Sequence, residues 1–410
     1  MRVAVIGGGA SGTMAAGYLA ERGAETVLFE KNEKLLKKLY ITGKGRCNLT
    51  NSCTADEFLT NVVRGGRFLS SSLRGFSPSD TMSFFEEHGL PLKTERGNRV
   101  FPLSDKSSDV IKTLARYLDR GGVKVVLNAE IGGIDPRTEG GFWVKYGSEK
   151  LPFDAVIVAT GGVSYPTTGS TGDGYRFAAR TGHSLVERVP ALCSVAVKED
   201  IGELEGLSLK NVSAAAYADG KKLCSEFGEM LFTDDSLTGP IILSLSSRIN
   251  RFAPEDLTVE VDLKPALTVE VLDDRILRDF QENLNRDFKN ALDALLPQSL
   301  IGYVIRETKI PPNKKVNEIK KEERKALVKT LKGLTFHVKS LGAIENAIVT
   351  SGGIELSSVN PKTMESKVAR GLYFVGEVLD IDALTGGFNL QLAFATGVAG
   401  AKGIISKVES

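Results

Sequence analysis

Three glycines near the start of the chain and one acid further on have the spacing of a dinucleotide-binding motif. Gly7, Gly9 and Gly12 form G-x-G-x-x-G, and Glu30 follows roughly 20 residues later. In this motif the first glycine makes a tight turn, the second lets the backbone approach a pyrophosphate, and the third allows close helix–strand packing. The acid accepts hydrogen bonds from adenosine ribose hydroxyls and would repel a 2′-phosphate, which argues against NADP. The motif predicts a site for NAD or FAD.

The sequence around these residues predicts the strands and the helix that must hold them. Residues 2–6 (RVAVI) predict a parallel strand buried on both faces, residues 13–22 a helix, and residues 26–30 (TVLFE) a second strand. Together they form a βαβ unit. Its helix would present free N–H groups and the positive end of its dipole to the phosphates.

Two more segments decide between NAD and FAD. A buried strand at 155–159 ends at Gly161-Gly162, and near the C-terminus a strand at 371–375 is followed by Gly376-Glu377. Gly386-Gly387 then opens a Gly/Ala-rich helix. This C-terminal stretch resembles the closing motif of FAD proteins with the glutathione-reductase type of Rossmann fold. The resemblance implies that the acid holds ribityl hydroxyls and that the helix start faces the flavin N1–O2 edge. We therefore predict FAD, bound non-covalently because no His, Tyr or Cys is placed by motif for attachment.

A family resemblance runs the whole length of the chain. The segment ATGGVSYPTTGSTGDG (159–174) is similar to the T-G-D-G region of fumarate-reductase-like flavoproteins. The segments TGKGRCNLTN (42–51), LFTDDSLTGP (231–240) and TSGGI (350–354) resemble the YhiN/BaiN-like bacterial FAD flavoproteins, which include aminoacetone-oxidase-type members. That family usually has histidine after L-F-T, where this chain has Asp234. If this position faces the substrate, the chemistry here differs.

The predicted fold class is α/β. A glutathione-reductase-type Rossmann FAD domain, residues 1–192 and 337–410, is interrupted by a β-barrel-like insert at 193–336. The insert alternates short strands around one apolar helix and carries a helical lobe at about 265–332. The barrel-like form of the insert is what the resemblance implies.

The candidate cofactor-binding residues follow from the motifs and the resemblance. The loop at 42–51 should pass beside the flavin, with Arg46 neutralising phosphate or a reduced flavin anion and Cys47 near the ring, where a buried inert cysteine is at least as well supported as a reactive one. Ile131 should end a strand that passes the adenine and contribute backbone bonds only. No catalytic acid or base and no metal ligand is assigned. The full set is Gly7, Gly9, Ala10, Ser11, Gly12, Glu30, Lys31, Lys38, Thr42, Gly43, Gly45, Arg46, Cys47, Asn48, Ile131, Ala159, Thr160, Gly161, Gly162, Gly172, Asp173, Gly376, Glu377, Gly386, Gly387, Asn389, Leu390 and Gln391.

Composition excludes several functional classes. The chain has 52 Lys and Arg against 51 Asp and Glu, so charge gives no reason to expect nucleic acid or an anionic membrane. Four scattered cysteines and three distant histidines predict neither a disulfide framework nor a metal site. No stretch reads as a signal peptide or a membrane span, so a cytoplasmic location is expected.

Two functional hypotheses of different class remain. The favoured one is an FAD-dependent oxidoreductase that passes hydride between flavin N5 and a small molecule held between the flavin and the insert. Whether it is a dehydrogenase, reductase or oxidase stays open, as do its oligomeric state and its redox partner, which could be oxygen, a quinone or NAD(P)H acting as a transient reductant. No second G-x-G-x-x-G unit indicates a dedicated nicotinamide domain. The alternative is a non-catalytic flavoprotein, or one associated with RNA modification, whose insert binds a partner; the lack of a basic stripe counts against RNA.

Overall fold

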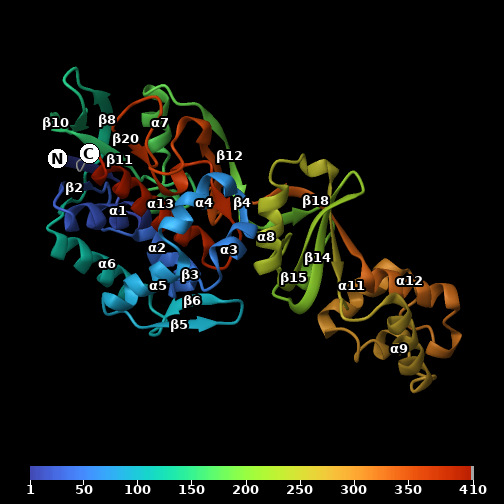
Figure 1. Cartoon of the computed structure of the whole chain (residues 1–410). Coiled ribbons are helices and arrows are strands. Elements are labelled where there is room, and N and C mark those ends of the chain that lie inside the picture. The colour runs from blue at the N-terminus through green and yellow to red at the C-terminus, as the bar shows by residue number, and fades with distance from the viewer. Residues whose placement is uncertain (408–410) are drawn as a thin grey trace. The chain divides into compact units, whose positions relative to one another are not determined.

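The computed structural model describes residues 1–407 and divides into two compact units, Met1–Ala191 with the chain from Ile344 onward, and Leu192–Ala343 (Figure 1). The sequence places the return to the first domain at residue 337. In the structure the strand β18 (Leu334–Leu341) pairs with β13 (Val195–Val197) and β17 (Leu257–Asp262), so the chain leaves the second unit only after that strand. The described residues contain no helix long and apolar enough to cross a membrane.

A five-stranded parallel sheet organises the first unit. Its order is β20-β11-β1-β2-β7, and each neighbouring pair runs parallel. The strands are β1 (Arg2–Ile6), β2 (Glu25–Phe29), β7 (Lys124–Val126), β11 (Ala155–Val158) and β20 (Leu372–Phe374). The Rossmann fold expected from the sequence is confirmed, and all five strands lie in the first unit.

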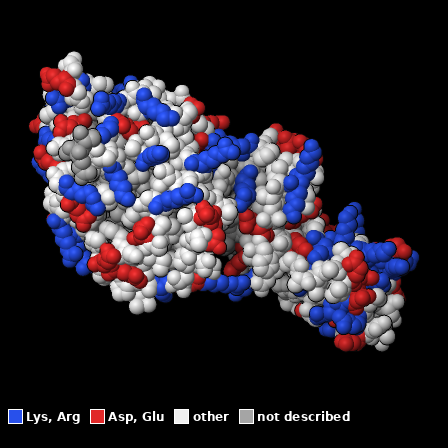
Figure 2. Space-filling model, viewed as in Figure 1, with Lys and Arg blue, Asp and Glu red and all other residues white. Residues whose placement is uncertain are grey.

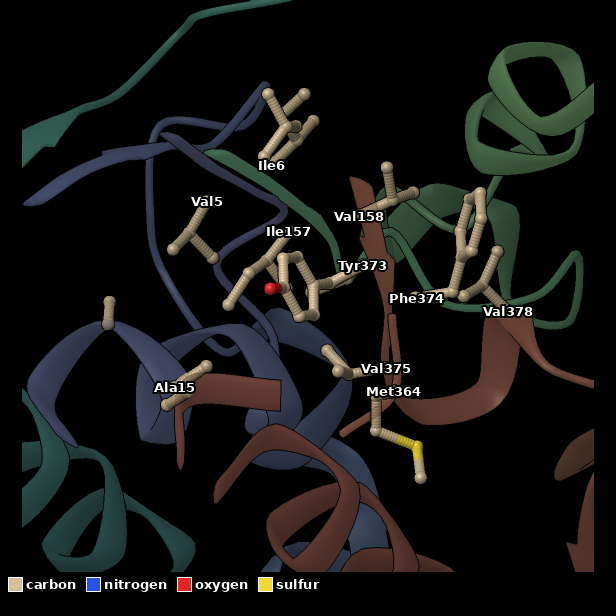
Figure 3. Close-up of a cluster of buried hydrophobic side chains, with 14 of the residues drawn as sticks. Val5, Ile6, Ala15, Ile157, Val158, Met364, Tyr373, Phe374, Val375 and Val378 are labelled. Carbon is tan, nitrogen blue, oxygen red and sulfur yellow. The ribbon is translucent and has the colours of Figure 1, made fainter. Parts of the chain in front are cut away.

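The sheet is apolar on both faces, as a parallel sheet requires. Val5, Ile157 and Tyr373, from three adjacent strands, are buried and converge in one core (Figure 3). The helices α1 (Ala10–Glu21), α6 (Ser107–Gly121) and α13 (Phe388–Ile405) pack against one another, with α1 in the middle. This packing fixes the starts of α1 and α13, which the sequence singled out.

The rest of the first unit surrounds the sheet with smaller elements. The stretch at 31–51 contains the short helix α2 (Lys37–Ile41), a 3-10 turn (Thr42–Gly45) and β3 (Thr50–Asn51). The other elements are α3 (Ala55–Thr60), β4 (Val62–Arg64), α4 (Gly66–Gly75), α5 (Pro78–Glu87), β5 (Leu92–Glu95), β6 (Arg99–Pro102), β8 (Ile131–Pro136), β9 (Phe142–Tyr146), β10 (Glu149–Phe153), α7 (Asp173–Arg180), β12 (Leu185–Ala191), β19 (Val349–Ile354) and β21 (Asp382–Ala383).

The second unit is a closed six-stranded antiparallel barrel with a helical lobe, which confirms the predicted fold class. The strand order is β13-β16-β15-β14-β17-β18. Its further strands and helices are β14 (Ser208–Ala218), β15 (Lys221–Phe232), β16 (Ser236–Thr238), α8 (Pro240–Ile249), α9 (Val269–Gln281), α10 (Phe288–Ala291), α11 (Gln298–Thr308) and α12 (Lys321–Lys332). One apolar core joins barrel and lobe, so the lobe is part of this folding unit.

Candidate functional site

A pocket at the ends of β1 and β2 collects most of the residues singled out from the sequence. The G-x-G-x-x-G turn, the acid after β2, the turn after β11 and the start of α13 all line it. From the predicted set the lining includes Gly7, Gly9, Ala10, Ser11, Glu30, Lys31, Lys38, Thr42, Ile131, Ala159, Thr160, Gly161, Asp173, Gly376, Glu377, Asn389 and Leu390.

The start of α1 is built to receive an anion. The helix has no side-chain cap at its N-terminus and no acid in its first turn, so its first N–H groups have no side-chain partner. A Cβ added at Gly9 would meet no protein atom within 4 Å, so this glycine borders open space in the pocket. At Gly12 a Cβ would lie 1.9 Å from the Gly7 carbonyl oxygen. Gly12 therefore serves packing and does not line the pocket.

Glu30 is held in place by its neighbours. It is 8% exposed, and its Oε2 accepts a hydrogen bond from the Gly8 N–H at 2.7 Å. Its Oε1 accepts from the Asn32 backbone N–H at 2.8 Å and from the Asn32 amide at 2.6 Å. Sequence reasoning did not single out Gly8 or Asn32, because backbone and amide donors to an acid leave no motif. The carboxylate is thus oriented before any ligand binds.

Two lysines from the segment after β2 tie separate segments of the chain together. Lys31 donates to Asp173 at 2.8 Å and also bonds the Thr171 hydroxyl, which joins the segment after β2 to the start of α7. Lys38 donates to both oxygens of Glu377, at 3.1 and 2.8 Å.

The structure places Ile131 at the start of β8, where it is buried and lines the pocket. The sequence analysis expected it at the end of a strand.

The loop at 42–51 contributes less to the pocket than expected. Only Thr42 of its predicted members lines it; Gly43, Gly45, Arg46, Cys47 and Asn48 do not. The Arg46 guanidinium instead pairs with Glu95 and Asp105, both at 2.5 Å, and lies over the Phe101 ring. Burial raises the pKa of the Cys47 thiol to about 12, so this side chain stays protonated at neutral pH.

The start of α13 packs against that loop. Gly387 has φ +95°, and a Cβ there would lie 2.3 Å from the Thr50 carbonyl oxygen. Gln391 accepts from the Thr50 hydroxyl at 2.8 Å and donates to the Phe76 carbonyl oxygen. The Gly386 carbonyl accepts from the Asn51 amide at 3.1 Å. Gly386, Gly387 and Gln391 therefore hold the loop and the helix together, and none of them lines the pocket.

Several pocket residues lie outside the predicted set. The chain after β11 passes the pocket again at Thr168, Gly169 and Ser170, while Gly162 and Gly172, which were in the set, do not line it. Ile348 and Val349, at the start of β19, also line it. The T-S-G-G segment that begins at Thr350 is the sequence signal beside these two residues. Asp234 is exposed in the second unit, in the turn between β15 and β16.

The residues present fit FAD on three observations. The uncapped start of α1 suits a pyrophosphate, and the fixed Glu30 carboxylate suits a ribose. Gly9 leaves room for close approach of the phosphates to the backbone.

Comparisons with known proteins agree with this geometry. The model of the HI0933-like protein Rossmann domain matches residues 1–403. The chain is 31% identical over 409 residues to the 3-dehydro-bile acid delta(4,6)-reductase of Clostridium scindens, covering 97% of each. It is 29% identical over 406 residues to the ribosomal RNA dihydrouridine synthase of Haemophilus influenzae, covering 96% of each. Among solved structures, 3-ketosteroid-delta4-(5alpha)-dehydrogenase from Rhodococcus jostii shares the fold, with TM-score 0.54, 12% identity, and coverage of 98% of this chain and 96% of that one.

Proposed function

The chain belongs to the HI0933-like family of FAD flavoproteins, and from that premise we propose that this FAD-dependent oxidoreductase reduces a conjugated double bond in a small alicyclic molecule. The pocket at the start of α1 supports the part of the proposal that concerns FAD. When bound there, FAD supplies the ring that accepts or donates a hydride.

The protein's own residues bind and orient in this proposal. The first turn of α1 holds the pyrophosphate, and Glu30 holds the adenosine ribose through the lone-pair site of Oε2 that Gly8 leaves free. Glu377 and Lys38, which pair with each other, both line the pocket.

The substrate class rests on kinship. The Clostridium scindens relative is named a reductase of a 3-dehydro-bile acid, and it aligns with nearly the whole of this chain. An unsaturated ring ketone is therefore the substrate class we propose, with NAD(P)H as the transient reductant. Amines, which the aminoacetone-oxidase-type members suggest, are the competing small-molecule class.

One observation favours a second candidate, an RNA substrate. Residues 309–332 hold nine Lys and Arg against three Glu. Four of these cations are paired with acids (Lys314, Lys315, Arg324 and Lys332), while Lys309, Lys320, Lys321, Lys325 and Lys329 are exposed. Figure 2 shows blue side chains gathered on this lobe among red ones. The Haemophilus influenzae relative is named for ribosomal RNA. The balanced charge of the whole chain conceals this exposed basic face, which suits a phosphate backbone and corrects the expectation that no basic stripe is present.

A single reoxidation experiment separates these candidates. Purified protein is loaded with FAD, reduced without oxygen, and mixed with a 3-keto-Δ4 steroid, with aminoacetone, or with a uridine-containing ribosomal RNA transcript. We expect reoxidation of the flavin by the enone alone. Reoxidation by the transcript, abolished when Lys320, Lys321, Lys325 and Lys329 are changed to Glu, would replace the small-molecule proposal.

The cofactor assignment has its own test. Glu30→Ala should weaken FAD binding by roughly 10- to 100-fold, since hydrogen bonds to a charged group contribute about 1.5–3 kcal/mol. The affinity is read from quenching of flavin fluorescence on titration of the apoprotein. Wild-type protein that takes up NAD and not FAD would refute the assignment.

A further inference from the structure

The carboxylate of Glu377, which lines the pocket, receives hydrogen bonds from three other segments of the chain. Lys38 Nζ donates to Oε1 at 3.1 Å and to Oε2 at 2.8 Å. The Ser164 hydroxyl donates to Oε1 at 3.1 Å, and the Thr350 backbone N–H donates to Oε1 at 2.8 Å. The three donors come from α2, from the turn after β11 and from β19.

Thr350 holds the turn after β11 as well as the acid. Its Oγ1 accepts from the backbone N–H groups of Val163 at 2.9 Å and Ser164 at 3.2 Å. Ser164 in turn accepts from Lys38 Nζ at 2.7 Å. Ser164 and Thr350 are both fully buried. Each of these buried polar groups forms a hydrogen bond with another group of the network. A buried network that is satisfied in this way favours a single arrangement of its side chains.

The turn after β11 can approach the network only because residue 162 has no side chain. A Cβ at Gly162 would lie 2.3 Å from Thr350 Oγ1 and 3.0 Å from Glu377 Oε1. Gly162 was expected to touch the cofactor; in the structure it faces Thr350 and Glu377. This close approach places the Ser164 hydroxyl next to the carboxylate.

The two oxygens of Glu377 are used unequally. Among the described residues, Oε1 accepts from Lys38, Ser164 and Thr350, whereas Oε2 accepts from Lys38 alone. A carboxylate oxygen has about two lone-pair sites. Oε1 is therefore saturated, and Oε2 keeps one site for a hydroxyl donor of a ligand in the pocket.

We propose that Ser164 and Thr350 are positioning residues that turn Oε2 of Glu377 toward a hydroxyl group of the bound cofactor. The proposal rests on the proposed function, in which this pocket holds FAD. An unrestrained glutamate would have to give up rotamer freedom when the ligand binds. The network removes that cost beforehand, so affinity gains from preorganisation.

The test is a double-mutant cycle on FAD affinity in the apoprotein. Ser164→Ala should raise the dissociation constant about tenfold, and Glu377→Ala about a hundredfold. If Ser164 acts through Glu377, the double variant should bind no more weakly than Glu377→Ala alone. Ser72→Ala, which removes another buried hydroxyl, bonded to the Leu69 carbonyl, is the matched control and should leave affinity unchanged.

Thr350 provides an independent arm. Thr350→Val removes the acceptor of two N–H groups and should therefore weaken FAD binding. Thr350→Ser keeps that acceptor, so this variant should retain both the FAD affinity and the shape of the visible flavin band. A full tenfold loss from Ser164→Ala on top of Glu377→Ala, or wild-type affinity in Ser164→Ala, would overturn the inference. Failure of the wild-type apoprotein to bind FAD would instead refute the proposed function.

Discussion

The first unit contains two glycine-rich turns that each open a helix, and they serve different purposes. At the start of α1, Gly9 borders open space in the pocket. At the start of α13, Gly387 is pressed against the Thr50 backbone. Both look like ligand-facing glycines in the sequence. The difference shows that a glycine at a helix start marks a close approach without saying whether a ligand or another part of the chain approaches.

The largest effect is expected at Gly387. Gly387→Ala places a Cβ against the Thr50 carbonyl in a backbone of positive φ, which should cost about 3 to 5 kcal/mol of stability. The contact with Thr50 therefore predicts loss of the fold itself. Thermal unfolding of the apoprotein measures it. Gly23→Ala, also at positive φ but with no atom near its Cβ, is the control and should cost about 1 kcal/mol.

The opposite behaviour is expected at Gly9. Its backbone is extended and its Cβ would touch no protein atom, so Gly9→Ala should leave the melting temperature of the apoprotein nearly unchanged. A methyl group directed at the pyrophosphate should still weaken FAD binding about tenfold, or roughly 1.4 kcal/mol. Fluorescence titration with FAD gives the affinity. If Gly9→Ala instead left FAD affinity unchanged and lowered the melting temperature, Gly9 would behave like Gly387, and the proposed difference between the two turns would be wrong.

The reactivity of Cys47 toward an alkylating reagent tests whether the loop at 42–51 stays packed against α13. Burial raises the pKa of the Cys47 thiol to about 12, so the thiol is almost entirely protonated at pH 8 and alkylation should be very slow. Cys53, in the same region and only partly buried, is the internal standard. Mass spectrometry of the two peptides after brief alkylation should show Cys53 modified and Cys47 intact. Equal rates at both positions would show that the loop opens readily.

The smallest effect concerns the ion pairs that anchor the same loop. Lys93 first and then Arg46 lower the pKa of the Asp105 carboxyl below its usual value of 3.8. A lowered pKa in the folded state adds stability above the unfolded pKa, and this is lost as pH falls through the folded value. Asp105→Asn should therefore melt slightly below wild type at pH 7 and approach it as the pH falls through 3.8 and further. A constant difference between the two proteins over that range would contradict the assignment.

Much of the fold could be predicted from local sequence because it depends on local patterns. Short, largely apolar runs such as residues 2–6 and 155–158 indicate buried strands, and Gly7 to Gly12 with Glu30 indicate a βαβ unit. The family was predicted from the T-G-K-G-R-C-N-L-T-N loop and is confirmed by the match over residues 1–403. The interruption of the Rossmann domain by a barrel with a helical lobe is likewise observed.

The tertiary structure decided which polar groups meet. Arg46, a free cation in the sequence, is neutralised by Glu95 and Asp105, which lie about 50 residues away in the chain. Ser164 and Thr350 lie in two segments that resemble family motifs, but neither motif indicates that they converge on Glu377. They meet there because β11, β19 and the turn after β20 lie together. Local periodicity fixes which elements form and which faces are buried. Hydrogen bonds between distant segments depend on how those elements pack, and no local pattern records that.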